Sequence, residues 1–228
     1  MTATTSTGAR NPLRLVGVVL LASLYALIAW SKLTLTFDAL GALRDGDGAQ
    51  HALIAAHSLS GFLFFGALAA VSVIRPSPVR RERRPIGWIL PMVVMGIFLV
   101  LGRIEPTRSE LWLVIPATLF AVVGTTATLV SLRRLGGNFG VVSDVRGFVF
   151  SGPYRRVRHP LYASELITSL GLLLVVLSPL TTIAFVLGAI AQVARARVEE
   201  QAVSAAFPEY REYAQRTPMF IPRFRVRL

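Results

Sequence analysis

The sequence predicts an all-α protein that crosses a membrane several times. Hydrophobic residues make up 54% of the 228 residues and charged residues only 16%, whereas a soluble domain carries about 25% charged residues. Five long stretches contain no Asp, Glu, Lys or Arg, and basic residues outnumber acidic ones by 24 to 12. This composition excludes an ordinary soluble domain and a disordered chain. The lack of cysteine also excludes disulfides, thiolate nucleophiles and cysteine-ligated metals.

The charge-free stretches mark the predicted membrane helices, because each charge buried in hydrocarbon costs a few kcal/mol. They are 15–31, 48–74, 85–102, 111–132 and 166–194. Each of the first four fits one helix of about 17–25 residues. The fifth is long for one span and contains Ser178-Pro179 near its middle, where proline favours a turn. We therefore predict a helical hairpin, roughly 161–177 and 180–200, and about six membrane helices in all.

The distribution of basic residues supports this topology. With six spans and a cytoplasmic N-terminus, twenty of the 24 basic residues fall on the cytoplasmic side, as the positive-inside rule expects. The other four fall in external loops: Lys32, Arg44, Arg103 and Arg108. Both termini are therefore predicted to be cytoplasmic, in an integral protein of the plasma membrane. The basic loop 75–85 is expected to contact lipid headgroups, and this topology excludes nucleic acid as a partner.

Two polar segments, 135–165 and 195–222, flank the two ends of the hairpin. Because a hairpin returns to its starting face, these segments should meet in space and form one site. We therefore divide the chain into an N-terminal four-helix membrane region, 1–134, and a core that contains the site, 135–228.

The first polar segment has features of an anion-binding site. After the turn signal Gly152-Pro153, Tyr154 and Arg158 belong to a basic, aromatic approach to the membrane. His159-Pro160 then opens the hairpin, with Pro160 suited to the first turn of a helix. The N-terminus of this helix suits a carboxylate or phosphate group. The alternative is that the arginines bind lipid phosphate and that His159 only caps the helix.

The second polar segment places carboxylates at the end of the hairpin. The side chains of Glu199 and Glu200 point about 100° apart around a helix, so each can bind a different partner. Carboxylates at this depth suit a cationic ligand group, but they could also form a solvated helix end with Arg195, four residues before Glu199. Glu165 falls near the membrane boundary, where such a residue normally faces a polar cavity or a neighbouring helix.

Several other chemistries lack the residues they need. The three histidines, His51, His57 and His159, have no close pairing with carboxylates in helical register, so we expect no metal site. No phosphate-binding loop of the G-x-x-x-x-G-K-[ST] type and no G-x-S-x-G nucleophile elbow occurs.

In these two segments the sequence resembles the integral-membrane methyltransferases of the isoprenylcysteine carboxyl methyltransferase and phospholipid methyltransferase family. The resemblance extends from residue 135 to 224. The matching residues are Gly152-Pro153-Tyr154-Arg155, Val157-Arg158-His159-Pro160, Tyr162, Glu199-Glu200, Phe207, Tyr210 and Tyr213. Their order and separation also match, with a hairpin between the two motifs. The sequence departs from the family at Ser164, where glycine is common and a hydroxymethyl group could narrow the cofactor cleft.

The resemblance implies that S-adenosylmethionine binds in a cytoplasmic pocket closed by the C-terminal segment. Its implied lining is Tyr154, His159, Pro160, Tyr162, Glu199 and Glu200; we count Arg158, which the hairpin brings to the same place, among the cofactor-binding residues. Arg195 matches the arginine near the reacting group of the substrate, and we assign a catalytic role to Arg195 and Glu200. Neither a metal nor a cysteine is required.

The predicted function is methyl transfer to a lipophilic substrate that enters from the bilayer. Arg195 would orient a carboxylate acceptor, which favours O-methylation. An amine acceptor, such as a phospholipid amine, must lose a proton to a glutamate or to Glu165, and N-methylation is the alternative. A non-enzymatic lipid-binding protein or small transporter is a further alternative, although the candidate polar residues gather at one face.

Overall fold

The computed structural model describes six stretches of the chain: residues 12–44, 48–74, 78–80, 84–103, 110–139 and 144–222. Within them the chain is helical without any β-strand, and Arg80 and Val145 form an isolated backbone bridge. The prediction of an all-α fold is confirmed. The expectations for Arg108 and for part of loop 75–85 concern positions outside the described residues.

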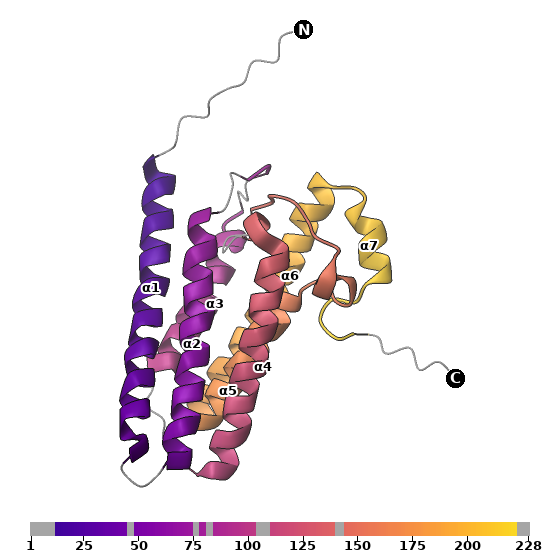
Figure 1. Ribbon diagram of the computed structural model, residues 1–228. Helices are drawn as coiled ribbons and strands as arrows, with labels where there is room; N and C mark the ends of the chain where they lie inside the picture. The colour runs from indigo at the N-terminus through magenta and orange to yellow at the C-terminus, as the bar shows by residue number, and fades with distance from the viewer. Residues whose placement is uncertain are drawn as a thin grey trace, which may run out of the picture.

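Six long helices run side by side in the bundle of Figure 1. Among the described residues they are α1 (Pro12–Gly41), α2 (Gly48–Ile74), α3 (Ile86–Arg103), α4 (Leu111–Leu135), α5 (Pro160–Val175) and α6 (Pro179–Ala206). The short helix α7 (Tyr210–Arg216) follows α6, and 3-10 turns cover Ala42–Arg44, Gly136–Asn138 and Gly152–Arg155.

Four helices of the described chain are long and apolar enough to cross a membrane. They contain the segments Val16–Gly41, Gly48–Ile74, Trp112–Asn138 and Pro179–Ala206. Helix α5 is apolar but has only 16 residues, which is shorter than the usual span of about 20 residues. Length and composition therefore support four spans, while the count of six and the orientation of the termini stay predictions.

The structure confirms the predicted helical hairpin. Helix α5 ends at Val175, and α6 begins at Pro179, in the first helical position where proline is favoured. Ser178 caps α6: its hydroxyl accepts from the backbone N–H of Thr181 at 3.2 Å, and its own N–H donates to the Thr181 hydroxyl at 2.9 Å. These reciprocal bonds satisfy two backbone donors at the turn.

Helix α1 extends further than the charge-free stretch predicts. It continues to Gly41, so Lys32 lies within the helix, and its predicted position in an external loop is wrong. The prediction ended the span at the first charged side chain. A membrane helix can nevertheless carry a charge where the side chain faces the interior of the protein.

Small residues allow α4 and α5 to approach closely, as is typical of helix contacts in membranes. A Cβ atom on Gly124 would lie 2.6 Å from the backbone nitrogen of Thr168, and one on Gly171 would lie 2.5 Å from the carbonyl oxygen of Ala117. The hydroxyls of Thr128 and Ser164 lie 2.8 Å apart in the same contact. Ser164 therefore faces α4, and it is absent from the lining of the polar cavity that the described residues form.

We expect Gly124→Ala to destabilise the protein by about 1–3 kcal/mol, because the added methyl group would meet backbone atoms of α5. Gly66→Ala in α2 is the matched control, since a Cβ atom there meets nothing within 4 Å and alanine favours a helix. Unfolding followed by circular dichroism in detergent measures both variants. Equal stability of Gly124→Ala and the wild type would contradict the close α4–α5 contact.

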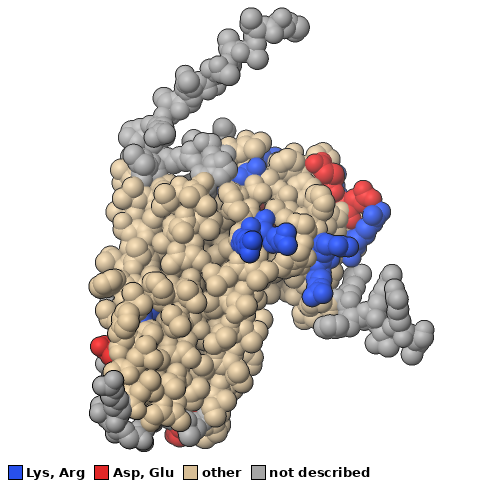
Figure 2. Space-filling model, viewed as in Figure 1, with Lys and Arg blue, Asp and Glu red and all other residues tan. Residues whose placement is uncertain are grey.

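On the face shown in Figure 2, lysine and arginine gather at the end of the bundle next to α7, and the flank of the bundle is almost free of charge. The apolar flank includes large exposed side chains such as Leu20, Trp30 and Leu119. This separation suits a bundle surrounded by lipid with one basic end. That this end faces the cytoplasm stays a prediction.

Candidate active site

The hairpin brings the start of α5 next to the C-terminal part of α6. Tyr162, in the first turn of α5, donates a hydrogen bond from its hydroxyl to Glu199 of α6. Arg158, just before α5, forms an ion pair with Glu200, with 2.5 Å between Nε and Oε1. The prediction that the two polar segments meet in space is confirmed.

Arg158 and Glu200 are the centre of a charged network. Arg158 Nη2 lies 3.2 Å from the second carboxylate oxygen of Glu200, so the pair is bidentate. Arg158 Nη1 donates to the carbonyl oxygens of Ala214 and Thr217, both at 2.6 Å. His159 Nε2 lies 3.0 Å from Glu200 Oε1. Because protein acceptors occupy most donors of Arg158, this arrangement makes Arg158 a residue that positions α6 and the C-terminal segment.

The C-terminal segment is tied to the loop before α5 by backbone hydrogen bonds. The N–H groups of residues 158–159 donate to the carbonyls of Pro218 and Met219 at 2.9 and 3.0 Å. The Tyr213 hydroxyl donates to the carbonyl of Tyr154 at 2.5 Å. The segment therefore covers the start of α5, as the resemblance implies for a closing segment.

His159 and the two glutamates do more than terminate helices. His159 occupies the N-cap position of α5 without a capping bond from its side chain. Its ring stacks on Tyr162 with the centroids 5.3 Å apart and the planes 9° apart. Glu199 and Glu200 are half-buried and contact α5 or the residues before it. The alternatives of a capping histidine and a solvated helix end are therefore not supported.

A small polar cavity of about 60 Å³ lies where the loop before α5 meets α6 and α7. Five of the residues predicted to bind a cofactor line it: Tyr154, Arg158, His159, Tyr162 and Glu199. The other two, Pro160 and Glu200, are not part of the lining that the described residues form. Pro160 instead occupies the first turn of α5, as predicted.

Tyr154 lines this cavity. Its hydroxyl is buried and has no hydrogen-bond partner among the described residues. Burial, and after it the charge of Glu199, raises the pKa of Tyr154 above its usual range, so the hydroxyl stays protonated. Burial also raises the pKa of Tyr213 to about 12. A buried donor without a partner costs about 1–3 kcal/mol, so a ligand that accepts from Tyr154 would recover this cost.

A second, apolar cavity of about 430 Å³ lies inside the helix bundle. Side chains of α1 to α6 line it, and its volume is within the range of about 300–1,000 Å³ that is common for ligand sites. Arg195 and Glu165 are among its charged lining residues, and the Glu165 carboxylate accepts a hydrogen bond from Gln192 of α6. Glu165 thus contacts a neighbouring helix, as one of its two expectations states, while the cavity that it lines is apolar and not polar.

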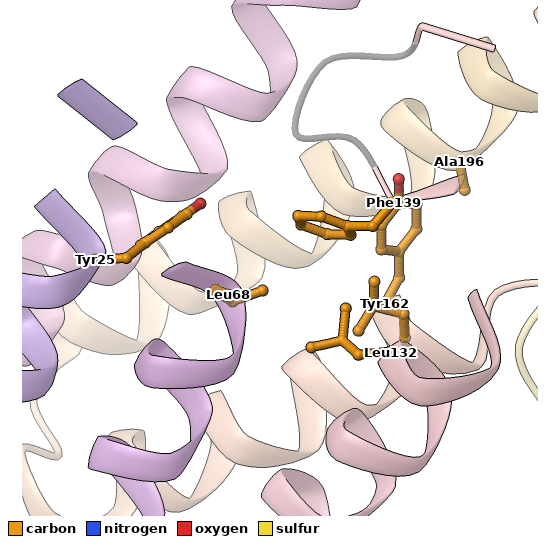
Figure 3. Packing of buried hydrophobic residues seen from close by; sticks show 7 residues of the cluster. Tyr25, Leu68, Leu132, Phe139, Tyr162 and Ala196 are labelled. Atoms are coloured by element: carbon orange, nitrogen blue, oxygen red, sulfur yellow. The ribbon is translucent and has the colours of Figure 1, made fainter. Parts of the chain in front are cut away.

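Phe139 and the stacked pair of Tyr162 and Arg195 separate the two cavities. Phe139 lines both of them, while Tyr162 lines the polar cavity and Arg195 the apolar one. The Arg195 Cζ atom lies 4.6 Å from the centroid of the Tyr162 ring, a cation–π contact. Figure 3 shows Phe139 beside Tyr162 in a buried cluster that also contains Tyr25 of α1. Phe139 is therefore part of the wall of both cavities.

The sequence carries no separate signal for several residues of the polar cavity. Asn138, Asp144 and Gly147 line it within the first polar segment, but none belongs to a recognisable motif. A Cβ atom on Gly147 would lie 2.8 Å from Asn138 Oδ1. Glycine at this position therefore leaves space for the Asn138 amide, which a sequence pattern does not reveal.

Comparison with known proteins places the chain in a family. A family model described as phospholipid methyltransferase matches residues 111–210. The nickel-cobalt-cadmium resistance protein NccN of Alcaligenes xylosoxydans xylosoxydans is 31% identical over 160 residues, which cover 67% of this chain and 72% of NccN. This chain belongs to the phospholipid methyltransferase family. The resemblance predicted from the motifs is confirmed.

A second relative aligns with a shorter region of the chain. The cobalt-zinc-cadmium resistance protein CzcN of Cupriavidus metallidurans is 45% identical over 76 residues, which cover 33% of this chain and only 35% of CzcN. The family match begins at residue 111 and so includes α4, which packs against α5. The division of the chain at residue 134 stays a prediction.

Proposed function

We propose that the protein transfers the methyl group of S-adenosylmethionine to a lipophilic acceptor. The observation that carries this proposal is the pair of cavities that share Phe139, one polar and one apolar. A soluble cofactor suits the polar cavity at the basic end of the bundle, and an acceptor from the bilayer suits the apolar cavity. Methyl transfer requires the reacting groups to touch, so side chains of the shared wall, Phe139 among them, would have to move aside for the reaction.

The chemistry of the polar cavity fits the cofactor. The Tyr154 hydroxyl is a buried donor without a partner among the described residues, and Glu199 and Asp144 are carboxylates that suit an ammonium or ribose hydroxyl groups. When bound, S-adenosylmethionine supplies a methyl group on a positively charged sulfur. The cavity volume of about 60 Å³ is below the usual range for ligand sites. Aromatic side chains that line the cavity, such as Phe148 and Tyr210, must therefore move aside for the cofactor to bind.

Arg195 favours a carboxylate acceptor and therefore O-methylation. Its guanidinium is buried against Tyr162 and borders the apolar cavity, where it can orient a carboxylate by charge-assisted hydrogen bonds. A carboxylate accepts a methyl group without losing a proton. The residues then have only to align the acceptor and exclude water.

Glu165 supports the second candidate, N-methylation of a lipid amine. An ammonium acceptor must lose a proton before it can accept a methyl group, and Glu165 borders the same apolar cavity as Arg195. It would act as the base in that reaction. A lipid-binding protein or small transporter is disfavoured, because membership of a methyltransferase family and the paired cavities suit an enzyme better.

We further propose that the site faces the cytoplasm and that the protein resides in the plasma membrane, where membrane lipids surround it. The basic end of the bundle supports this orientation. Two relatives are named for resistance to metal ions. Among the described residues, no group of three or more His, Cys, Asp or Glu side chains is arranged to hold a metal ion, and our proposal includes no metal site.

The test has two steps. Calorimetry with purified protein in detergent should show binding of S-adenosylhomocysteine, the demethylated product, and absence of binding would refute the cofactor assignment. Membranes that contain the protein should then transfer a labelled methyl group from S-adenosylmethionine to a lipid-soluble product. Release of the label by mild base indicates an ester and O-methylation, whereas a base-stable product indicates N-methylation by the Glu165 route.

A further inference from the structure

The apolar cavity contains a second group of polar side chains besides Arg195 and Glu165. Lys32 of α1 and His57 of α2 also line it. Neither residue belongs to the family motifs, and the proposed methyl transfer gives no role to either. The cavity is otherwise lined mostly by apolar side chains from α1 to α5 and by Phe139.

The stem of Lys32 lies over a glycine of α2. A Cβ atom on Gly61 would lie 3.2 Å from Lys32 Cγ and 3.3 Å from Lys32 Cδ. His57 precedes Gly61 by four residues, so both lie on the same face of α2. The Nδ1 atom of His57 is buried and has no hydrogen-bond partner among the described residues. Lys32 and His57 thus form one polar group on the cavity wall.

Lys32 has no carboxylate partner within the part of the chain that the structure describes. Glu165, which also lines the cavity, is bonded to Gln192 instead. An ammonium group inside a membrane helix is costly, and such residues normally face a cavity and pair with an opposite charge. The cavity therefore offers a cation that a bound anion would neutralise.

The helix geometry gives the distance between the two groups of polar side chains in the apolar cavity, Arg195 at one end and Lys32 with His57 at the other. Tyr25 of α1 and Leu68 of α2 belong to the buried cluster with Tyr162, beside Arg195. Lys32 follows Tyr25 by seven residues and Gly61 precedes Leu68 by seven, which is about 10 Å along each helix. Both helices thus place the backbone of Lys32 about 10 Å along the bundle from the wall between the cavities.

We propose that the apolar cavity binds an elongated amphiphile with two polar ends. Its methyl-accepting group lies at Arg195, and an anionic group about 10 Å away is bound by Lys32 with His57. This inference rests on the proposed function, because the acceptor end is defined by the site of methyl transfer. A diacyl lipid fits less well, since its acyl chains would surround the Lys32 ammonium without neutralising it.

The test compares radiolabelled nonanedioate, with a carboxylate at each end, and nonanoate, with one, bound to the full chain in nanodiscs of zwitterionic lipid. We expect the wild type to bind nonanedioate at least about tenfold more tightly, as for one charge-assisted hydrogen bond. Lys32→Met, which keeps the length of the side chain, should abolish this preference, and Lys32→Arg should retain much of it. Ser31→Ala is the matched control, because Ser31 lines the same cavity with its hydroxyl bonded to Ile28 of its own helix.

Binding of S-adenosylhomocysteine separates this inference from the proposed function. We expect Lys32→Met to bind it as tightly as the wild type. If it does and the variant also keeps the wild-type preference for nonanedioate, Lys32 only extends toward the membrane surface and the inference is overturned. If no form of the protein binds S-adenosylhomocysteine but the Lys32-dependent preference is present, the proposed function fails and the anion site stands. If Lys32→Met does not fold, equal affinities of the wild type for the two ligands would still overturn the inference.

Discussion

Replacing Glu199 with glutamine is expected to weaken the binding of S-adenosylhomocysteine by about tenfold to a hundredfold, the worth of a hydrogen bond to a charged group. Glu199 lines the polar cavity together with Tyr154, whose hydroxyl has no partner within the described part of the chain. Glutamine keeps an oxygen that can accept from the Tyr162 hydroxyl but removes the negative charge that a ligand ammonium requires. The temperature of unfolding should therefore change little. Calorimetry measures the affinity, and circular dichroism in the same detergent measures unfolding.

Glu212→Gln is the matched control for this prediction. It makes the same chemical change on α7, where Glu212 is exposed and pairs with Arg216 one turn away. We expect its affinity for S-adenosylhomocysteine to equal that of the wild type. Wild-type affinity in Glu199→Gln would show that the cofactor does not contact Glu199, and the role that the family resemblance implies for this residue would be wrong.

The fold could be predicted where the signals are local. Ser178-Pro179 marks the hairpin turn because proline fits the first position of α6. The helix ends were less predictable. Lys32 ended the first predicted span, yet α1 continues to Gly41, because a cavity built by five other helices accommodates the lysine. A rule that ends a span at the first charged residue cannot predict this, because the cavity is formed by other segments of the chain.

The sequence could predict that the two polar segments contact each other, but not what each side chain of the site does. Hairpin geometry brings Tyr162 to Glu199 and Arg158 to Glu200, as expected. The sequence does not indicate that Arg158 and Glu200, 42 residues apart, form an ion pair with each other, or that Arg158 also holds the C-terminal segment. Phe139 has no chemical signature at all, and its place between the cavities depends on how α4 ends beside α5 and α6.

Replacing Arg158 with methionine is therefore expected to destabilise the protein by about 3 kcal/mol, the lower part of the range for breaking a buried ion pair. The Arg158 and Glu200 side chains are only 13% and 17% exposed, and the carbonyls of Ala214 and Thr217 would also lose their donor. Thermal unfolding in detergent measures the loss. Proteolysis should also cut the C-terminal segment faster, because this segment is held by the same guanidinium.

Two further variants separate the loss of the pair from a general effect of removing an arginine. Arg216→Met breaks an exposed pair with Glu212 and should cost no more than about 0.5 kcal/mol. Adding Glu200→Gln to Arg158→Met should restore part of the lost stability, because the carboxylate then no longer lies uncompensated beside His159. If the double variant is instead less stable than Arg158→Met, Glu200 contributes to stability through His159 and Tyr210 rather than through Arg158. The cofactor role predicted for Arg158 would then have to be tested independently of its structural one.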